Sequence, residues 1–395
     1  MASASGVLAA AAAAAAAATP PAAAAAAVAP PSASGSSTGS DKCGPLSYET
    51  CAATFKGSSG VVAGLADGRI AAAASDGSIA VWELSPRGAR QVVTLRGGGG
   101  GKAITNLAAL SDGRLVSACN SESCVRVWEA TGTGGRAVAT ISMESAPLAL
   151  AVLPGDRLAV STSGDATISV WDLGGNRVAR LTGTGSIATT LAALPDGRVA
   201  GASQGETSIR VWDLAGRMTT TTLSGAGGGV PVRPFGAPPD GGVRALAALP
   251  DGRLAVCTGS KTVRLLQVSS DGDGERATTS LKTDGPVGTM AVLPDGRLAC
   301  TFSAGSGGGP RAGGMMMMHV VGGAYVGGVG YDAYGNPTAA TALSVWKVAS
   351  GGAAVREATM AAHTNGVSAL AALPDGRLVS CSATDSEVKV WGAYE

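Results

Sequence analysis

Few residues of this chain have the types and spacing that catalysis requires. The string GASQG at residues 201–205 fits the Gly-x-Ser-x-Gly pattern of an esterase nucleophile, which would be Ser203. Such a nucleophile needs a strand that runs into a helix, whereas the residues around Ser203 predict a strand that runs into a turn. The sequence has only two histidines, His319 and His363, so general-base chemistry is poorly supported. The sequence therefore predicts a protein that is not an enzyme and has no catalytic residue.

Binding motifs for phosphate and zinc are equally weak. RGGGGGKA at residues 96–103 is similar to a phosphate-binding loop, but Arg96 replaces its first glycine and Ala103 replaces its hydroxyl residue. The seven cysteines include no Cys-x-x-Cys pair and no histidine at zinc-ligand spacing. We expect small buried thiols in a reducing compartment, with a disulfide between Cys43 and Cys51 as the lesser alternative. No cofactor or metal site is predicted.

One segment does contain soft ligands for copper. Met315, Met316, Met317 and Met318 precede His319, and thioether and imidazole groups bind Cu(I). Four consecutive methionines cannot all face one ion in an extended chain. A Cu(I)-handling protein is therefore an alternative hypothesis and not the main prediction.

A nine-residue motif occurs seven times in the chain. Its copies begin at residues 64, 109, 152, 193, 248, 292 and 372, and the last one reads ALPDGRLVS. The aspartate bonds its own backbone and the glycine takes the positive φ that closes a hairpin, so each copy predicts two antiparallel strands. A second turn and an alternating segment that ends in Trp predict a third strand in most copies.

A fourth strand adjoins most copies, so the predicted fold class is all-β, a seven-bladed β-propeller of four-stranded antiparallel blades. The copies recur at a period of roughly 40 to 45 residues where no insertion intervenes, which is typical of propellers. The last copy lacks a fourth strand, whereas CAATFKG at residues 51–57 has the pattern of a fourth strand with no blade before it. We therefore expect residues 51–57 to complete the last blade and close the ring, which also protects the sheet edges.

The third strands carry a resemblance to a known family. They contain VWEL at residues 81–84, VWEA at 127–130, VWDL at 170–173 and 211–214, and VWG at 390–392. An acidic residue stands six positions before Trp in five copies, at Asp76, Glu122, Asp165, Glu206 and Asp385. In these features residues 51–395 resemble the WD-repeat (Trp-Asp repeat) β-propeller family. The fifth copy departs from the pattern, because Leu266 stands in place of Trp.

The resemblance implies a structural hydrogen-bond network within a blade. The last copy supplies its members from His363, Ser380 or Ser382, Asp385 and Trp391. Other copies lack the histidine, so we expect only parts of the network there, including Asp76 with Trp82 and Asp165 with Trp171. The resemblance also implies a scaffold, an adaptor, or a ubiquitin- or substrate-recognising subunit of a ubiquitin-pathway complex.

Composition and charge limit the other partners. The chain has 29 basic and 28 acidic residues and a formal net charge of +1, so no nucleic-acid or anionic-lipid partner is expected. Residues 1–50 are rich in Ala, Pro and Ser, with no charged side chain before Asp41, and predict a low-complexity tail. A targeting segment there is the lesser alternative, because no Lys or Arg precedes the apolar stretch. No membrane span is predicted, and the expected location is cytoplasmic or nuclear.

Two insertions, residues 224–242 and 304–340, interrupt the repeat. The first joins blade four to blade five and the second separates the second and third strands of blade six, and connections of these two kinds emerge on the same face of a propeller. The insertions contain residue types that are enriched at the centres of protein interfaces, namely Arg233, Phe235, Met315, Met316, Met317, Met318, His319, Tyr325, Tyr331 and Tyr334. Gly-rich filler in a tolerant surface loop is the alternative. The sequence thus predicts a protein-interaction scaffold or adaptor whose partners dock on this face, and it leaves the oligomeric state open.

Overall fold

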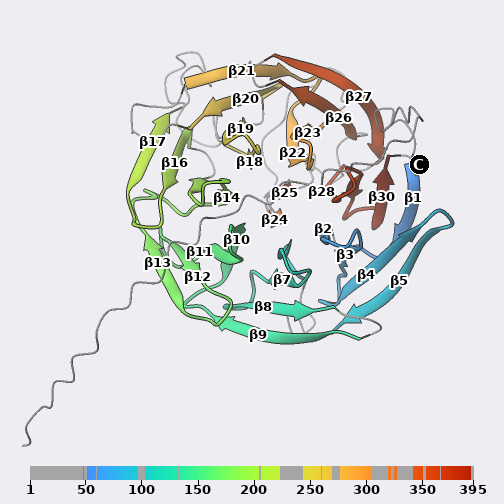
Figure 1. Ribbon diagram of the computed structural model, residues 1–395, viewed down its shortest axis with the longest axis horizontal. Coiled ribbons are helices and arrows are strands. Elements are labelled where there is room, and N and C mark those ends of the chain that lie inside the picture. Colours follow the sequence, from blue (N-terminus) through green and yellow to red (C-terminus); the bar gives the residue numbers. More distant parts are fainter. Residues whose placement is uncertain are drawn as a thin grey trace, which may run out of the picture. The chain divides into compact units, whose positions relative to one another are not determined.

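Short apolar segments separated by tight turns form the strands, as the repeat predicts. The computed structural model describes residue 48 and residues 51–58, 60–96, 103–130, 134–203, 206–222, 243–258, 260–268, 276–303, 319–321, 324–326, 341–349, 353–364 and 366–392. The chain divides after Gly44, and all of these residues belong to the second unit, Pro45–Glu395. The described strands form seven four-stranded antiparallel sheets and one hairpin, and the sheets stand as blades around a ring (Figure 1). The prediction of a seven-bladed, all-β propeller is confirmed.

The four strands of each blade run from the centre of the ring outwards. The first strands are β2 (Val62–Gly64), β6 (Asn106–Ala109), β10 (Pro147–Leu153), β14 (Thr190–Ala193), β18 (Ala245–Ala248), β22 (Val287–Val292) and β28 (Ala369–Ala372). The second strands are β3 (Ile70–Ala73), β7 (Leu115–Ala118), β11 (Arg157–Thr162), β15 (Val199–Ala202), β19 (Arg253–Cys257), β23 (Leu298–Ser303) and β29 (Leu378–Cys381). The third strands are β4 (Ile79–Ser85), β8 (Cys124–Glu129), β12 (Ile168–Trp171), β16 (Ser208–Trp212), β20 (Thr262–Gln267), β26 (Thr341–Val348) and β30 (Glu387–Trp391). The outermost strands are β5 (Gly88–Leu95), β9 (Arg136–Ser142), β13 (Arg177–Leu181), β17 (Met218–Thr222), β21 (Arg276–Lys282), β27 (Ala354–His363) and β1 (Cys51–Lys56).

The tryptophans occupy one register position on the third strands. Trp128, for example, lies opposite Leu115, and Trp391 lies opposite Leu378. In blade five Leu266 takes the same position opposite Leu254 and is buried, with 2% of its surface exposed. The blade therefore keeps its register and fills the position with a smaller apolar side chain.

The ring is closed by a strand from the other end of the chain. β1 pairs antiparallel with β30, from Cys51 opposite Trp391 to Lys56 opposite Glu387. Phe55 in β1 stacks on Trp82 of blade one, with ring centroids 4.4 Å apart. The predicted closure by residues 51–57 is confirmed, and the aromatic stack joins the last blade to the first.

Each nine-residue motif forms a tight turn between its first two strands. In blade one, the Leu65 carbonyl accepts a hydrogen bond from Gly68 N at 3.0 Å, and Asp67 Oδ1 accepts one from Arg69 N at 3.1 Å. Gly68 has a φ of 83°, a conformation that glycine adopts at no steric cost. Blade three reverses the order to Gly155 and Asp156, and the carboxylate there accepts hydrogen bonds from the backbone and hydroxyl of Ser111 in blade two.

The arginine of the motif binds adjacent blades together. Its side chain is held by the aspartate of the same turn and donates from Nη2 to a backbone carbonyl just beyond the third strand of the next blade. These bonds are Arg69 to Ala130 at 2.8 Å, Arg198 to Val268 at 3.3 Å and Arg253 to Ala349 at 3.1 Å. In these three copies the motif shapes a turn within one blade and also attaches that turn to the next blade.

Replacing Arg253 by methionine is expected to destabilise the fold by about 2–4 kcal/mol, because it leaves the Ala349 carbonyl and the Asp251 carboxylate without their buried cationic donor. The Arg253 side chain is 4% exposed. Arg217 makes the same backbone and Nε contacts to Asp213 but is 87% exposed, so Arg217→Met should leave the melting temperature nearly unchanged. Thermal unfolding followed by circular dichroism checks both variants, and equal effects would exclude the inter-blade role.

A short hairpin lies at the centre of the ring. β24 (His319–Val321) pairs with β25 (Ala324–Val326), and their backbones neighbour the first strands of six blades, β6, β10 and β14 for β24 and β18, β22 and β28 for β25 (Figure 1). Among the residues that the structure describes, no helix is long and apolar enough to cross a membrane.

Candidate functional site

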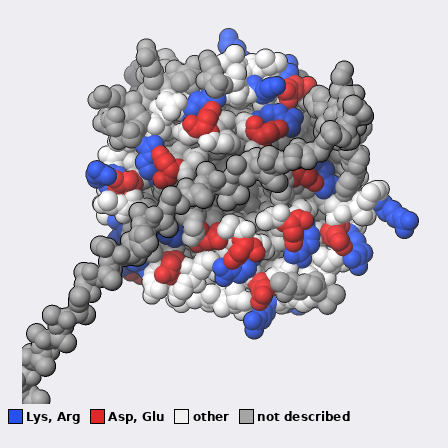
Figure 2. Space-filling view, viewed as in Figure 1, with Lys and Arg blue, Asp and Glu red and all other residues white. Residues whose placement is uncertain are grey.

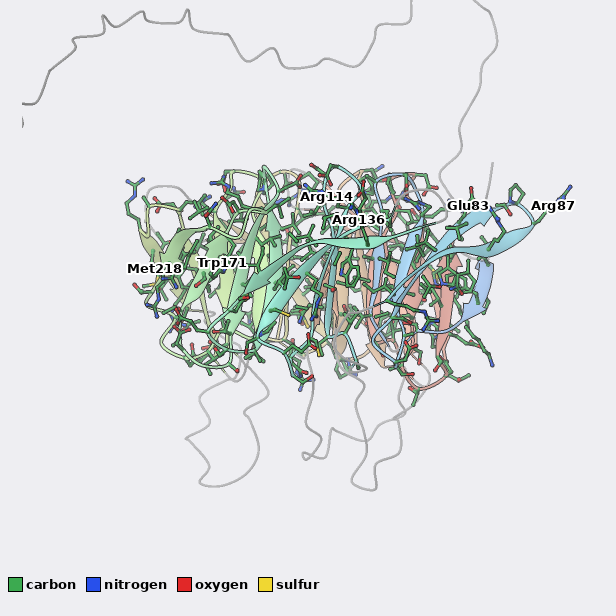
Figure 3. The ribbon with its side chains drawn as sticks, turned by 90° about the horizontal axis from the view of Figure 1, so that it is seen from below. Glu83, Arg87, Arg114, Arg136, Trp171 and Met218 are labelled. Atoms are coloured by element: carbon green, nitrogen blue, oxygen red, sulfur yellow. The ribbon has the colours of Figure 1, made fainter. Side chains whose placement is uncertain are left out.

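Strand direction sorts the connections of every blade onto two faces of the ring. The face with the turns between first and second strands and between third and fourth strands is called the turn face here, and the opposite one the insertion face. Arg87, Arg114 and Arg136 lie along the turn face at the upper edge of Figure 3. The ends of β17 and β23, after which the sequence continues into residues 224–242 and 304–340, lie on the insertion face. The prediction that both insertions start from one face agrees with these strand ends.

The turn face is covered with ion pairs that the fold itself uses. Figure 2, which shows this face, has acidic and basic side chains next to one another around the ring. Six of the motif turns contribute an Asp-Arg pair within the described residues, with nitrogen-oxygen distances of 2.6–2.7 Å. The hydrogen bond from Arg114 holds the pKa of the Asp112 carboxyl below its ordinary value. These charges are satisfied within the blades and offer little to a charged partner.

Blade seven brings four predicted network residues together near the insertion face. Ser380 Oγ lies 2.9 Å from His363 Nε2 and accepts a hydrogen bond from Trp391 Nε1 at 2.8 Å. His363 Nδ1 lies 3.4 Å from Asp385 Oδ2. Burial lowers the pKa of His363, although the Asp385 carboxylate opposes the shift. Ser380 is the serine that joins the network, and Ser382 instead lies beside Thr384.

Blades one and three do not form the partial networks that were expected. Asp76 accepts hydrogen bonds from the backbone and hydroxyl of Ser78, and Trp82 Nε1 is buried with no hydrogen-bond partner in the described part of the chain. Trp171 Nε1 likewise has no partner among the described residues. The physical reason is that Trp stays in these positions for its apolar contacts, such as the stack of Trp82 on Phe55.

In blades two to four, an arginine pairs with the acidic residue that stands six positions before Trp. The pairs are Glu122 with Arg126 at 2.5 Å, Asp165 with Arg180 at 2.7 Å, and Glu206 with Arg210 at 2.9 Å. Burial raises the pKa of Glu206, but hydrogen bonds from Ser186 and Arg210 outweigh it, and the net shift is downward. These arginines were not among the predicted network residues, although Arg126 and Arg210 stand two positions before Trp.

One cluster near blade seven has the side chains of a metal site. Single ligand atoms of His363, Asp385 and Glu387 lie within 4.8 Å of one another. However, Lys389 Nζ lies 3.6 Å from Glu387 Oε2, and both nitrogens of His363 already face polar atoms of the network. These contacts favour a structural cluster over a metal centre.

Most of the predicted partner-binding residues fall outside the described residues. This holds for Arg233, Phe235, Met315, Met316, Met317, Met318, Tyr331 and Tyr334. His319 and Tyr325 belong to β24 and β25, whose backbones lie among the first strands at the centre of the ring. Part of the second insertion therefore returns to the ring axis. Its Gly-rich composition has no clear period, so this position could not be predicted from sequence.

Tyr48 lies within residues 1–50, which the sequence predicts to be a low-complexity tail. Its side chain is 2% exposed, its hydroxyl donates to the Gly376 carbonyl at 2.7 Å, and it accepts from Arg297 Nη2 at 2.8 Å. Burial raises the pKa of Tyr48 to about 12. Tyr48 therefore packs against the propeller and connects the turns of blades six and seven.

The first strands that surround the ring axis contain few polar side chains. As described, all seven lack Asp, Glu, His, Lys, Arg and Cys. Their polar side chains are those of Asn106, Thr190 and Thr289, all with 0% exposure.

Comparison with known proteins supports the family. Residues 49–83 and 355–392 match the family described as WD domain, G-beta repeat. No curated protein matches the chain in sequence. The fold is similar to a chain in the crystal structure of the Mitotic Checkpoint Complex, with 15% identity, 91% of this chain and 97% of that one covered, and a TM-score of 0.62.

Two further solved structures have the same fold. One is the Myceliophteria thermophila Cps50 (Swd1) β-propeller domain, with 14% identity, a TM-score of 0.63, and 88% of this chain and 100% of that one covered. The other is the WD40 β-propeller domain of Doa1, with 16% identity, a TM-score of 0.59, and 89% and 98% coverage. The two matched segments and the seven-bladed ring agree with the resemblance to the WD-repeat β-propeller family, and the solved structures share its fold.

Proposed function

We propose that the protein is a non-catalytic interaction scaffold whose partners dock on the insertion face. The observation that carries the proposal is that β17 and β23 both end on this face, at the two places where long insertions interrupt a regular ring. A closed ring presents such connections on a fixed frame, so a partner can bind with little ordering of the scaffold.

Two further observations support this role. The seven first strands around the ring axis, as described, hold no carboxylate, imidazole or amine, so they supply no general acid or base. The chain in the Mitotic Checkpoint Complex belongs to an assembly, and by analogy a protein partner is the natural ligand here.

The proposal predicts that partner recovery depends on the insertion face. Affinity purification from native cell extract should recover a partner with the intact chain and lose it when residues 304–340 are replaced by a short Gly-Ser turn. Arg87→Glu is the matched control, because Arg87 is exposed on the turn face and should leave recovery unchanged. Thermal unfolding shows whether each variant keeps its fold. Loss of the partner with Arg87→Glu, and not with the replaced insertion, would overturn the proposed face.

A further inference from the structure

Blade two has two cysteines on either side of one tight turn. β7 pairs with β8 in a register that sets Ala118 opposite Val125. The paired ladder ends there, and extending its register by one residue sets Cys119 opposite Cys124. The corresponding step is present in blade seven, where Ser382 N donates to the Glu387 carbonyl at 3.0 Å, and in blade one, where Ala74 N donates to Ser78 at 2.8 Å.

Directly opposite residues of an antiparallel pair point to the same side of the sheet. Their Cα atoms are about 4.5–5.5 Å apart, which lies within the range of about 4.4–6.8 Å that a disulfide spans. Both thiols also approach the turn between them. Cys119 Sγ lies 2.9 Å from Ser121 Oγ, and Cys124 Sγ lies 3.5 Å from Glu122 Oε2.

In three other blades, the two positions that correspond to Cys119 and Cys124 hold a pair of hydroxyl residues. The same two positions hold Thr162 and Thr167 in blade three, Ser203 and Ser208 in blade four, and Thr258 and Thr262 in blade five. Blade two therefore differs from these blades at both positions together. The other described cysteines of the second strands, Cys257, Cys300 and Cys381, lie opposite Ala, Val, Met or Ser on both neighbouring strands.

We infer that Cys119 and Cys124 form a reversible disulfide that oxidation closes across the second turn of blade two, on the insertion face. With peroxide as the oxidant, the Cys124 thiolate attacks one oxygen and becomes a sulfenic acid as hydroxide leaves. The Cys119 sulfur then attacks the Cys124 sulfur, and water leaves as the disulfide forms. The two thiols supply the two electrons that reduce the peroxide, and a dithiol reductant reverses the reaction by thiol-disulfide exchange.

The solvent exposure of the two thiols is consistent with this order of steps. Cys124 is half-buried and meets the oxidant first, whereas Cys119 is 2% exposed and acts as the resolving thiol. Burial, partly offset by Arg126, raises the pKa of Cys124, so an excess of peroxide is needed at neutral pH. The inference does not depend on the proposed docking role.

Peptide mapping of the full-length protein tests the inference. After treatment with hydrogen peroxide and blocking of the remaining thiols, non-reducing mass spectrometry should find a peptide pair linked through Cys119 and Cys124, and dithiothreitol should remove it. Cys124→Ser should abolish the linked pair, and Cys381→Ser, in a fully buried position, should leave it unchanged. If Cys124 is instead recovered as a free thiol or a sulfinic acid with no link to Cys119, the inference is wrong.

Discussion

Deleting residues 51–57 is expected to lower the melting temperature by about 5–10 °C, the largest effect of any change considered for this protein. The deletion removes β1 and so exposes the hydrogen-bonding edge of β30. It also removes Phe55, which is 9% exposed and stacks on Trp82 of blade one. Loss of a buried phenylalanine alone costs about 3–5 kcal/mol.

Two point variants distinguish the contribution of the strand pairing to the melting temperature from that of the aromatic contact. Phe55→Ala should produce a large share of the loss, because it removes the aromatic stack between the last blade and the first. Lys56→Ala is the control on the same strand, since Lys56 is exposed and should change little. Differential scanning calorimetry measures all three, and an unchanged melting temperature after the deletion would show that the β1-β30 pairing contributes nothing to the ring.

Replacing Ser380 by alanine is expected to cost about 2–5 kcal/mol, roughly twice the cost of the same change at Ser117. Ser380 Oγ serves two buried side chains, Trp391 and His363, and both lose their partner in the variant. Ser117 Oγ accepts a hydrogen bond from one buried side chain, Trp128 Nε1, at 2.8 Å, and so is the matched position.

Urea unfolding of the two variants checks this difference. Equal losses of free energy would mean that the contact between His363 and Ser380 adds no stability. A larger loss for Ser117→Ala would contradict the network of blade seven altogether.

Sequence alone could predict the turns and strands that interactions between neighbouring residues determine. The turn aspartate and glycine determine a hairpin whatever surrounds them, and the alternation before each Trp determines a half-buried strand. The unmatched outer strand at residues 51–57 also predicted the closure, because a lone edge strand needs a partner.

Contacts between distant residues could not be predicted in this way. The bond from Arg253 to the Ala349 carbonyl joins residues 96 positions apart, and a carbonyl has no sequence signature. Tyr48 follows a low-complexity tail, so nothing in its neighbourhood indicated burial between two blades. Trp82 and Trp171 fit the family pattern in sequence, yet packing and not hydrogen bonding keeps them in place.

Hydrogen-deuterium exchange of the protein with and without its recovered partner tests docking on the insertion face most directly. The proposal predicts slower exchange in the connections of that face, such as residues 162–167 and 182–189 beside blades three and four. Turns of the opposite face, such as residues 193–198 and 248–253, should exchange as they do in the free protein. Protection confined to the Asp-Gly-Arg turns, with none on the insertion face, would contradict the proposal.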